Sequence, residues 1–181
     1  MEKHRNPYHP VAVANYFVCL GKQEKVSISV LKLVKLVHMA HGWHLALCDE
    51  PLLDEAVEAW TFGPMIPSVY HTFKKWENKP IKGVEKILNE ENPSEWVLPS
   101  IHEQDEQLLT LLNHVWSIYK KFTTHELSLL AHREGSAWQE AQKVYKGRAL
   151  RNRHIPDSII QEEFKQLNLL SQQLALKTAD R

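Results

Sequence analysis

The chain has 181 residues, of which 43% are hydrophobic and 24% are charged, a composition typical of a single globular domain. Its 22 Lys and Arg residues balance 22 Asp and Glu residues, which argues against the broad basic surface of a nucleic-acid-binding domain. No apolar run approaches the roughly 18 residues of a membrane span, and residues 1–7 lack the apolar core of a signal peptide. We therefore expect a soluble, cytoplasmic protein with no membrane partner.

Two helices are predicted in the N-terminal part of the chain. Pro10 suits a first helical turn and Gly21 is a typical helix end. Ser29 is a good N-cap for the second helix, in which apolar residues recur at spacings of three and four as far as Leu47. A glycine inside this pattern, Gly42, is expected to permit close packing.

Four polar or reactive residues of these helices need separate interpretation. Lys32 and Lys35 fall off the apolar face of the second helix. Cys19 and Cys48 each lie in a helical apolar pattern, so we expect two buried thiols and no disulfide scaffold.

A short strand over residues 56–62 is predicted next, because it contains Val, Trp and Phe and precedes Gly63-Pro64. Gly followed by Pro forms a rigid corner and removes one backbone donor. Pro67 then opens a third helix. The corner is interpreted mainly as a structural elbow that locks the strand to this helix.

The same corner has a functional interpretation. Trp60 and Tyr70 would line a stiff aromatic edge, and aromatic side chains on rigid backbone are typical anchors of protein interfaces. The strand could equally offer an unpaired edge to a strand of a partner.

The second half of the chain is predicted to be mostly helical. Residues 86–88 and 96–98 are strand-like, and they could form one small antiparallel sheet with residues 56–62. Capping boxes at residues 100–103 and 123–126 predict two helix starts. The second of these helices would end at Gly135, a short helix would cover residues 138–145, and Pro156 would open the last helix.

These elements predict a mainly α fold, a single globular domain of about seven helices with a small antiparallel β element. The predicted organisation is an N-terminal arm over residues 1–9, a domain over residues 10–176 and a frayed tail over residues 177–181.

No catalytic or cofactor constellation is found. His38, His41 and His44 follow one another at spacings of three. Two residues three apart on a helix can share a ligand, but His38 and His44 lie too far round the helix for all three to do so. The two cysteines have no zinc-type spacing, and the sequence contains no HExxH, GxSxG, P-loop or GxGxxG motif. We expect no metal, no cofactor and no enzymatic activity.

A DNA-binding regulator of phage or mobile-element origin is the alternative. Helices near residues 124–133 and 137–145 superficially suggest a helix-turn-helix, but the neutral charge and the lack of a polar recognition face weigh against nucleic acid. The residues that could contact phosphate are Lys32, Lys35, Lys74, Lys75, Lys120, Lys121 and the basic segment 146–153.

Three blocks of sequence resemble the Panacea, or SocA-like antitoxin, family. KLVKLVHMAHG at residues 32–42 is similar to its KLxKLxYxAxG helix. PL at 51–52, EAW at 58–60, GP at 63–64 and PSVY at 67–70 resemble its PL…EAWxxGPVxPxVY block. LSLLAH at 127–132 and EGSAW at 134–138 resemble LSxLTHxEGSPW. The blocks occur in the family's order over roughly residues 10–170, and Ile155-Pro156-Asp157 with Phe164 resembles the closing helix.

The chain departs from the family pattern at core or turn positions. His38 stands in place of Tyr, Met65 in place of Val, Ala131 in place of Thr and Ala137 in place of Pro.

The resemblance implies a bacterial or phage-borne antitoxin that binds and neutralises a protein toxin encoded beside it. One branch of the family instead delivers the toxin to a cytoplasmic ATP-dependent protease, and a homodimer is left open. The candidate partner-binding residues are Lys32, Lys35, Glu58, Trp60, Gly63, Pro64, Pro67, Tyr70 and His132. For Trp138, in the same block as His132, we expect packing.

Overall fold

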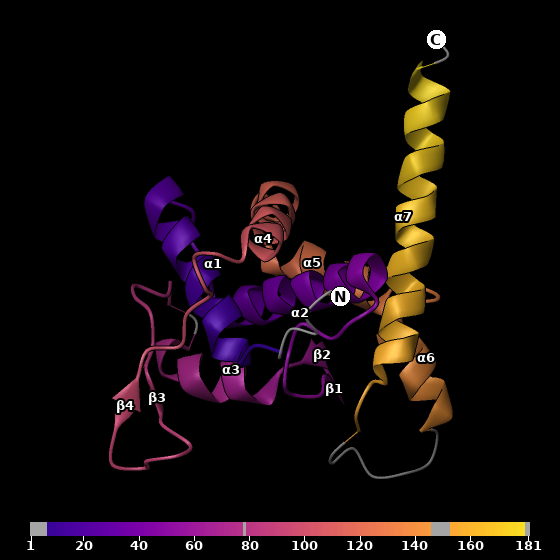
Figure 1. Ribbon diagram of the computed structural model, residues 1–181. Helices are drawn as coiled ribbons and strands as arrows, with labels where there is room; N and C mark the ends of the chain where they lie inside the picture. The colour runs from indigo at the N-terminus through magenta and orange to yellow at the C-terminus, as the bar shows by residue number, and fades with distance from the viewer. Residues whose placement is uncertain (1–6, 78, 146–152, 180–181) are drawn as a thin grey trace, which may run out of the picture.

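The computed structural model describes residues 7–77, 79–145 and 153–179 (Figure 1). Over these residues the protein is mainly α, as predicted, with small two-stranded antiparallel sheets. The helices are α1 (Pro10–Glu24), α2 (Val30–Cys48), α3 (Pro67–Phe73), the 3₁₀ turn η1 (Lys74–Trp76), α4 (Glu106–Tyr119), α5 (Thr124–His132), α6 (Ala137–Val144) and α7 (Asp157–Ala179). The strands are β1 (Glu58–Trp60), β2 (Gly63–Met65), β3 (Ile87–Leu88) and β4 (Trp96–Val97).

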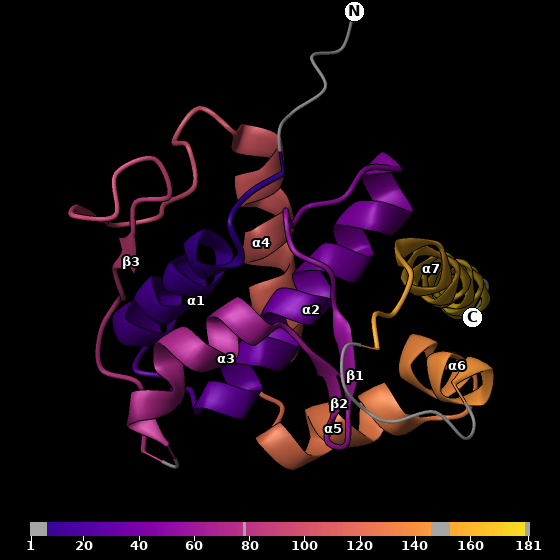
Figure 2. The same cartoon turned by 90° about the horizontal axis from the view of Figure 1, so that it is seen from below.

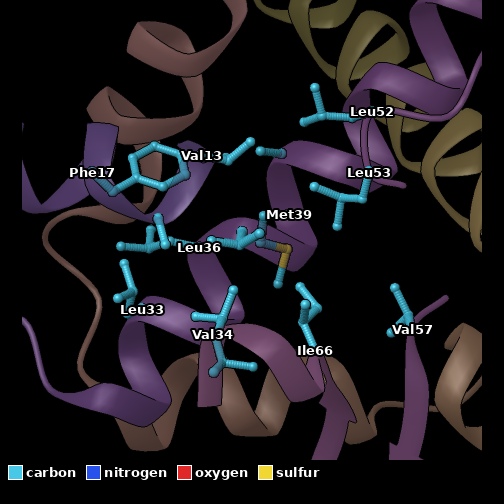
Figure 3. Packing of buried hydrophobic residues seen from close by; sticks show 14 of the residues in the cluster. Val13, Phe17, Leu33, Val34, Leu36, Met39, Leu52, Leu53, Val57 and Ile66 are labelled. Atoms are coloured by element: carbon cyan, nitrogen blue, oxygen red, sulfur yellow. The ribbon is translucent and has the colours of Figure 1, made fainter. Parts of the chain in front are cut away.

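Helix α2 lies at the centre of the molecule (Figures 1 and 2). It packs against α1, α3, α4, α5, α7 and β2, so its apolar residues are buried on several sides. Figure 3 shows Leu33 and Leu36 of α2 near Phe17 of α1. Ile66, which follows the β1–β2 hairpin, belongs to the same buried cluster. A helix surrounded in this way has no solvent-facing stripe over most of its length.

The prediction that Lys32 and Lys35 fall off the buried face of this helix is therefore wrong. Lys32 is 7% exposed and Lys35 is 1% exposed. The prediction for Cys19 and Cys48 is also wrong, because both thiols are exposed, although neither forms a disulfide.

Strands β1 and β2 form a hairpin with a two-residue turn, Thr61-Phe62, and Trp60 lies opposite Gly63. The predicted strand is thus real but shorter, and the predicted Gly63-Pro64 corner is its partner strand. The strand-like pieces at 86–98 are confirmed as β3 and β4. They form a separate sheet rather than one sheet with β1.

Several predicted helix ends are confirmed and others are not. Pro10 opens α1, and Ser29 caps α2 by accepting from the Lys32 backbone N–H. The capping box at residues 123–126 is present. Helix α1 passes through Gly21 to Glu24, and α4 starts at Glu106 with Asp105 as its cap, so the predicted capping box at residues 100–103 is wrong.

Helix α7 crosses α2 at Gly42. A Cβ atom built on Gly42 would lie 2.2 Å from Cε2 of Phe164. The Phe164 ring also meets the Trp43 ring edge to face, with centroids 5.4 Å apart. The prediction that Gly42 permits close packing is therefore confirmed.

Parts of the predicted organisation fall outside the described residues. These are residues 1–6 of the predicted arm, residues 146–152 of the basic segment 146–153 and residues 180–181 of the predicted tail. Among the helices that the structure describes, none combines the length and the apolarity needed to cross a membrane.

Candidate functional site

The β1–β2 turn is held from inside the protein by Lys35 of α2. The Nζ atom of Lys35 donates hydrogen bonds to the carbonyl oxygens of Phe62 and Pro64, both at 2.9 Å. Within the described residues no acidic side chain forms an ion pair with it. Burial lowers the pKa of Lys35 to about 7. Lys35 is thus an interior side chain, and its two hydrogen bonds to backbone oxygens connect α2 to the hairpin.

Two further side chains hold the same turn from α5 and α6. Trp138 donates from Nε1 to the Trp60 carbonyl at 2.7 Å. Nε2 of His132 lies 3.5 Å from the Thr61 carbonyl, while its Nδ1 lies 2.7 Å from the Ser128 carbonyl. Since Nδ1 must donate to Ser128, Nε2 can also donate to Thr61 only when the imidazole is protonated. The His132 and Trp138 rings pack with centroids 4.3 Å apart.

Gly63 makes this arrangement possible. Its φ is +100°, a conformation that suits glycine. A Cβ atom at this position would lie 2.6 Å from Nζ of Lys35 and 3.2 Å from Cε1 of His132. Lys35 and His132 can therefore approach the turn this closely because residue 63 has no side chain.

The side chain of Phe62, in contrast, points away from the core and is 65% exposed. Sequence reasoning missed Phe62, because it placed the residue inside a strand. A turn between two short strands is the available signal, whereas the pattern read as one strand predicts a corner at Gly63-Pro64.

The predicted aromatic edge is present beside the turn. Trp60 and Tyr70 are half-buried, and their rings meet edge to face with centroids 5.5 Å apart. The exposed His71 ring completes the group, 5.5 Å from Tyr70 and 6.4 Å from Trp60. Glu58 accepts a hydrogen bond from Nε1 of Trp60 at 2.6 Å, which fixes the orientation of the indole.

The prediction of an unpaired strand edge is wrong. On the side of β1 away from β2, the Ala59 N–H donates to the Arg153 carbonyl and the Ile155 N–H donates to the Val57 carbonyl, both at 2.7 Å. On β2, Pro64 has no N–H and its carbonyl is bound by Lys35. A partner strand would have to displace these contacts.

The structure brings together most, but not all, of the candidate residues from the sequence. Those at or beside the hairpin are Lys35, Glu58, Trp60, Gly63, Pro64, Tyr70 and His132. Pro67 begins α3. Lys32 lies elsewhere, where its Nζ donates to the Lys120 carbonyl at 2.6 Å, after the end of α4.

Two of the three histidines of α2 are part of the core, and His44 is half-buried. His38 and His41 are buried, and Nε2 of His41 lies 3.1 Å from Oδ1 of Asp157. Burial, aided by the charges of Lys35, His41 and Arg133, lowers the pKa of His38 well below its ordinary value. No group of three His, Cys, Asp or Glu residues in the described part of the chain is arranged to hold a metal ion.

The contribution of the Trp138 hydrogen bond can be measured with Trp138→Phe. The phenyl ring keeps most of the contact with His132 but leaves the Trp60 carbonyl without its donor. We expect a loss of about 1–2 kcal/mol in the free energy of unfolding, measured by urea denaturation. Trp96→Phe, at a 60% exposed position on β4, is the control and should change stability little.

Comparison with known proteins bears on this geometry. The family description "Antitoxin SocA-like, Panacea domain" matches residues 33–139, which include Lys35, the hairpin, His132 and Trp138. The chain is similar to antitoxin SocA of Caulobacter vibrioides, with 27% identity over 162 residues, covering 85% of this chain and 81% of that protein. No solved structure matches significantly. The family resemblance expected from the sequence motifs is thus confirmed, and the chain belongs to the SocA-like antitoxin family.

Proposed function

We propose that this protein is an antitoxin that binds a protein toxin through the hairpin surface and thereby neutralises it in the cytoplasm. The hairpin surface is defined here as Trp60, Phe62, Tyr70 and His71. The observation that carries the proposal is the exposure of Phe62 on a hairpin whose carbonyls accept hydrogen bonds from Lys35 of α2 and Trp138 of α6. The role requires binding and no catalysis.

Physical chemistry supports this choice of surface. Binding loses less entropy when the interface backbone is already fixed in the unbound protein. Lys35 and Trp138 fix the turn through carbonyl oxygens that point inward, so the outward side remains available. Aromatic side chains are enriched among the residues that contribute most to interface affinity, and the hairpin surface carries Trp60, Phe62 and Tyr70 together.

Two routes to neutralisation remain within the proposal. Contact alone could block the toxin, or the antitoxin could deliver it to a cytoplasmic ATP-dependent protease. We favour blocking by contact, because the rigid surface requires no further component. In a host that lacks the protease, contact alone still rescues growth, whereas delivery does not.

Co-expression with the product of the adjacent gene tests the function. We expect that gene to arrest growth alone, this chain to restore growth, and the two proteins to co-purify. Absence of both rescue and co-purification would contradict the proposed function.

The DNA-binding alternative finds less support in the described contacts. Lys32 and Lys35 are buried, Lys75 pairs with Glu85, and Lys120 pairs with Glu24. These four lysines are therefore engaged within the protein. A salt-dependent mobility shift of promoter DNA would favour this alternative over the antitoxin role.

The aromatic edge can be tested with Trp60→Ala and Tyr70→Ala. We expect each to weaken toxin binding at least tenfold, because each removes half of the Trp60–Tyr70 ring pair. The exposed Trp96, on the separate β3–β4 hairpin, provides the control Trp96→Ala. If the two variants lose thermal stability but keep the wild-type affinity for the toxin, the edge is structural and the partner binds elsewhere.

A further inference from the structure

A pocket lies at the C-terminal end of α1. Three parts of the chain line it: the last turns of α1, the connection to α2 and residues 80–82 before β3. Two backbone hydrogen bonds of 2.9 Å hold these parts together, from the Val26 N–H to the Gly21 carbonyl and from the Ile81 N–H to the Ile28 carbonyl. Figure 2 shows the chain before β3 passing beside this end of α1, apart from the β1–β2 turn. The pocket is thus separate from the hairpin surface.

The base of the pocket is apolar. Val18 and Ile28 belong to the buried core, and Val26 and Ile81 are half-buried. The pocket volume is about 310 Å³, at the lower end of the range for ligand pockets, roughly 300–1,000 Å³. A space of this size suits a large apolar side chain of a partner.

Three lysines accompany this apolar base. Lys22 lies in the last turn of α1, Lys25 caps the helix, and Lys82 comes from the chain before β3. All three are exposed, and in the described part of the chain none of them forms an ion pair. No Asp or Glu is among the described residues that line the pocket.

Two acidic residues that are close to these lysines in sequence are engaged elsewhere. Glu24 pairs with Lys120, and Glu85 pairs with Lys75. Each of the two carboxylates also accepts a hydrogen bond from a tryptophan N–H. The pocket therefore carries local positive charge, although the net charge of the whole chain is zero.

We propose that the pocket binds an acidic segment of a partner protein, in which an apolar side chain is flanked by carboxylates. The apolar side chain fills the base of the pocket, and the carboxylates pair with the lysines. Because Lys22 and Lys25 come from one wall and Lys82 from another, acids on both sides of the apolar side chain match them. Ion pairs at exposed lysines contribute little affinity by themselves, so burial of the apolar side chain is needed for binding and the charges select the partner.

The same lysines fit nucleic acid less well. Proteins that bind single strands stack the bases on aromatic side chains, and no aromatic residue is among the described residues that line the pocket. Three lysines are also few for a protein held by phosphate contacts.

Fluorescence anisotropy of the full chain with a labelled peptide tests the proposal. The probe is a short peptide with one leucine flanked by two glutamates on each side, and two reference peptides carry glutamine for glutamate or serine for leucine. We expect a dissociation constant on the order of 100 µM, as for a small exposed interface, and at least tenfold weaker binding of both reference peptides. Raising NaCl from about 50 to 500 mM should weaken binding severalfold, because salt screens exposed charges.

A pair of charge reversals tests the lysines. Lys22→Glu combined with Lys82→Glu should raise the dissociation constant of the probe at least tenfold. Both positions are exposed, so the thermal unfolding temperature should stay the same. Lys143→Glu combined with Lys165→Glu, on α6 and α7, makes the same change in net charge away from the pocket and should leave binding unchanged.

The possible results separate the alternatives. No binding of the probe at millimolar concentration would overturn the proposal, as would equal affinity for either reference peptide or equal weakening by the control pair. Tighter binding of a single-stranded oligonucleotide, abolished by the same two charge reversals, would assign the pocket to nucleic acid instead. The assay uses no toxin, so its result is independent of the proposed function.

Discussion

The difference in unfolding free energy between the wild-type protein and a Lys35→Met variant is expected to change with pH. Burial holds the pKa of Lys35 at about 7 in the folded protein, whereas an unfolded lysine has a pKa of about 10.4. Between these values the unfolded chain binds a proton that the folded chain does not. The stability of the wild-type protein relative to the variant should therefore increase with pH in this range.

The size and sign of this effect follow from linkage. The destabilisation of the wild-type protein by the buried Lys35 is complete below pH 7. It disappears as the pH approaches the pKa of lysine in the unfolded chain. From pH 7 to pH 9, wild-type stability should rise relative to the variant by about 2 kcal/mol. Urea denaturation at both pH values measures this difference.

The variant also separates the charge of Lys35 from its hydrogen bonds. Methionine leaves the carbonyls of Phe62 and Pro64 without the Lys35 donor, at a cost of about 1–3 kcal/mol for the buried Pro64 carbonyl. At pH 9 the variant should therefore be the less stable protein. Lys75→Met, at a surface ion pair with Glu85, is the control and should show no such pH dependence. A difference that stays constant from pH 7 to pH 9 would show that Lys35 keeps an ordinary pKa.

Gly42→Ala should destabilise the protein although alanine is the better helix former. At an open position this change would stabilise a helix by about 1 kcal/mol. At Gly42 the new methyl group would meet the Phe164 ring at 2.2 Å. Overpacking of this kind costs about 1–3 kcal/mol, which thermal or urea denaturation can detect.

A second substitution tests the assigned cause. In a Phe164→Leu background the smaller side chain gives the methyl group room, so the effect of Gly42→Ala should shrink. Gly83→Ala has no atom within 4 Å of the new Cβ and should be nearly neutral. If Gly42→Ala stabilises the wild-type protein, the described contact between α2 and α7 is wrong.

Local sequence signals predicted much of this fold. The residues that begin helices act locally, so Pro10, Ser29 and the capping box at 123–126 could be recognised without a structure. The apolar spacing of α2 also indicated that Gly42 lies against a neighbouring element. Long-range contacts were not accessible in this way.

Lys35 illustrates why part of the site could not be predicted. A pattern of polar and apolar residues assigns lysine to the surface, but α2 is covered on nearly every side. The groups that satisfy its ammonium, the carbonyls of Phe62 and Pro64, come 27 and 29 residues later in the chain. Their position depends on a hairpin whose second strand contains Pro64, and proline is rarely found inside a strand.

The central claim is that Phe62 of the fixed turn binds the toxin. Calorimetric titration of the product of the adjacent gene, the proposed toxin, into wild-type protein, Phe62→Ala and Leu47→Ala measures this most directly. Leu47 is 53% exposed at the end of α2 and serves as the control. We predict that Phe62→Ala weakens binding at least tenfold, about 1.4 kcal/mol, with unchanged thermal stability, while Leu47→Ala binds like wild type. Wild-type affinity in Phe62→Ala would contradict the account.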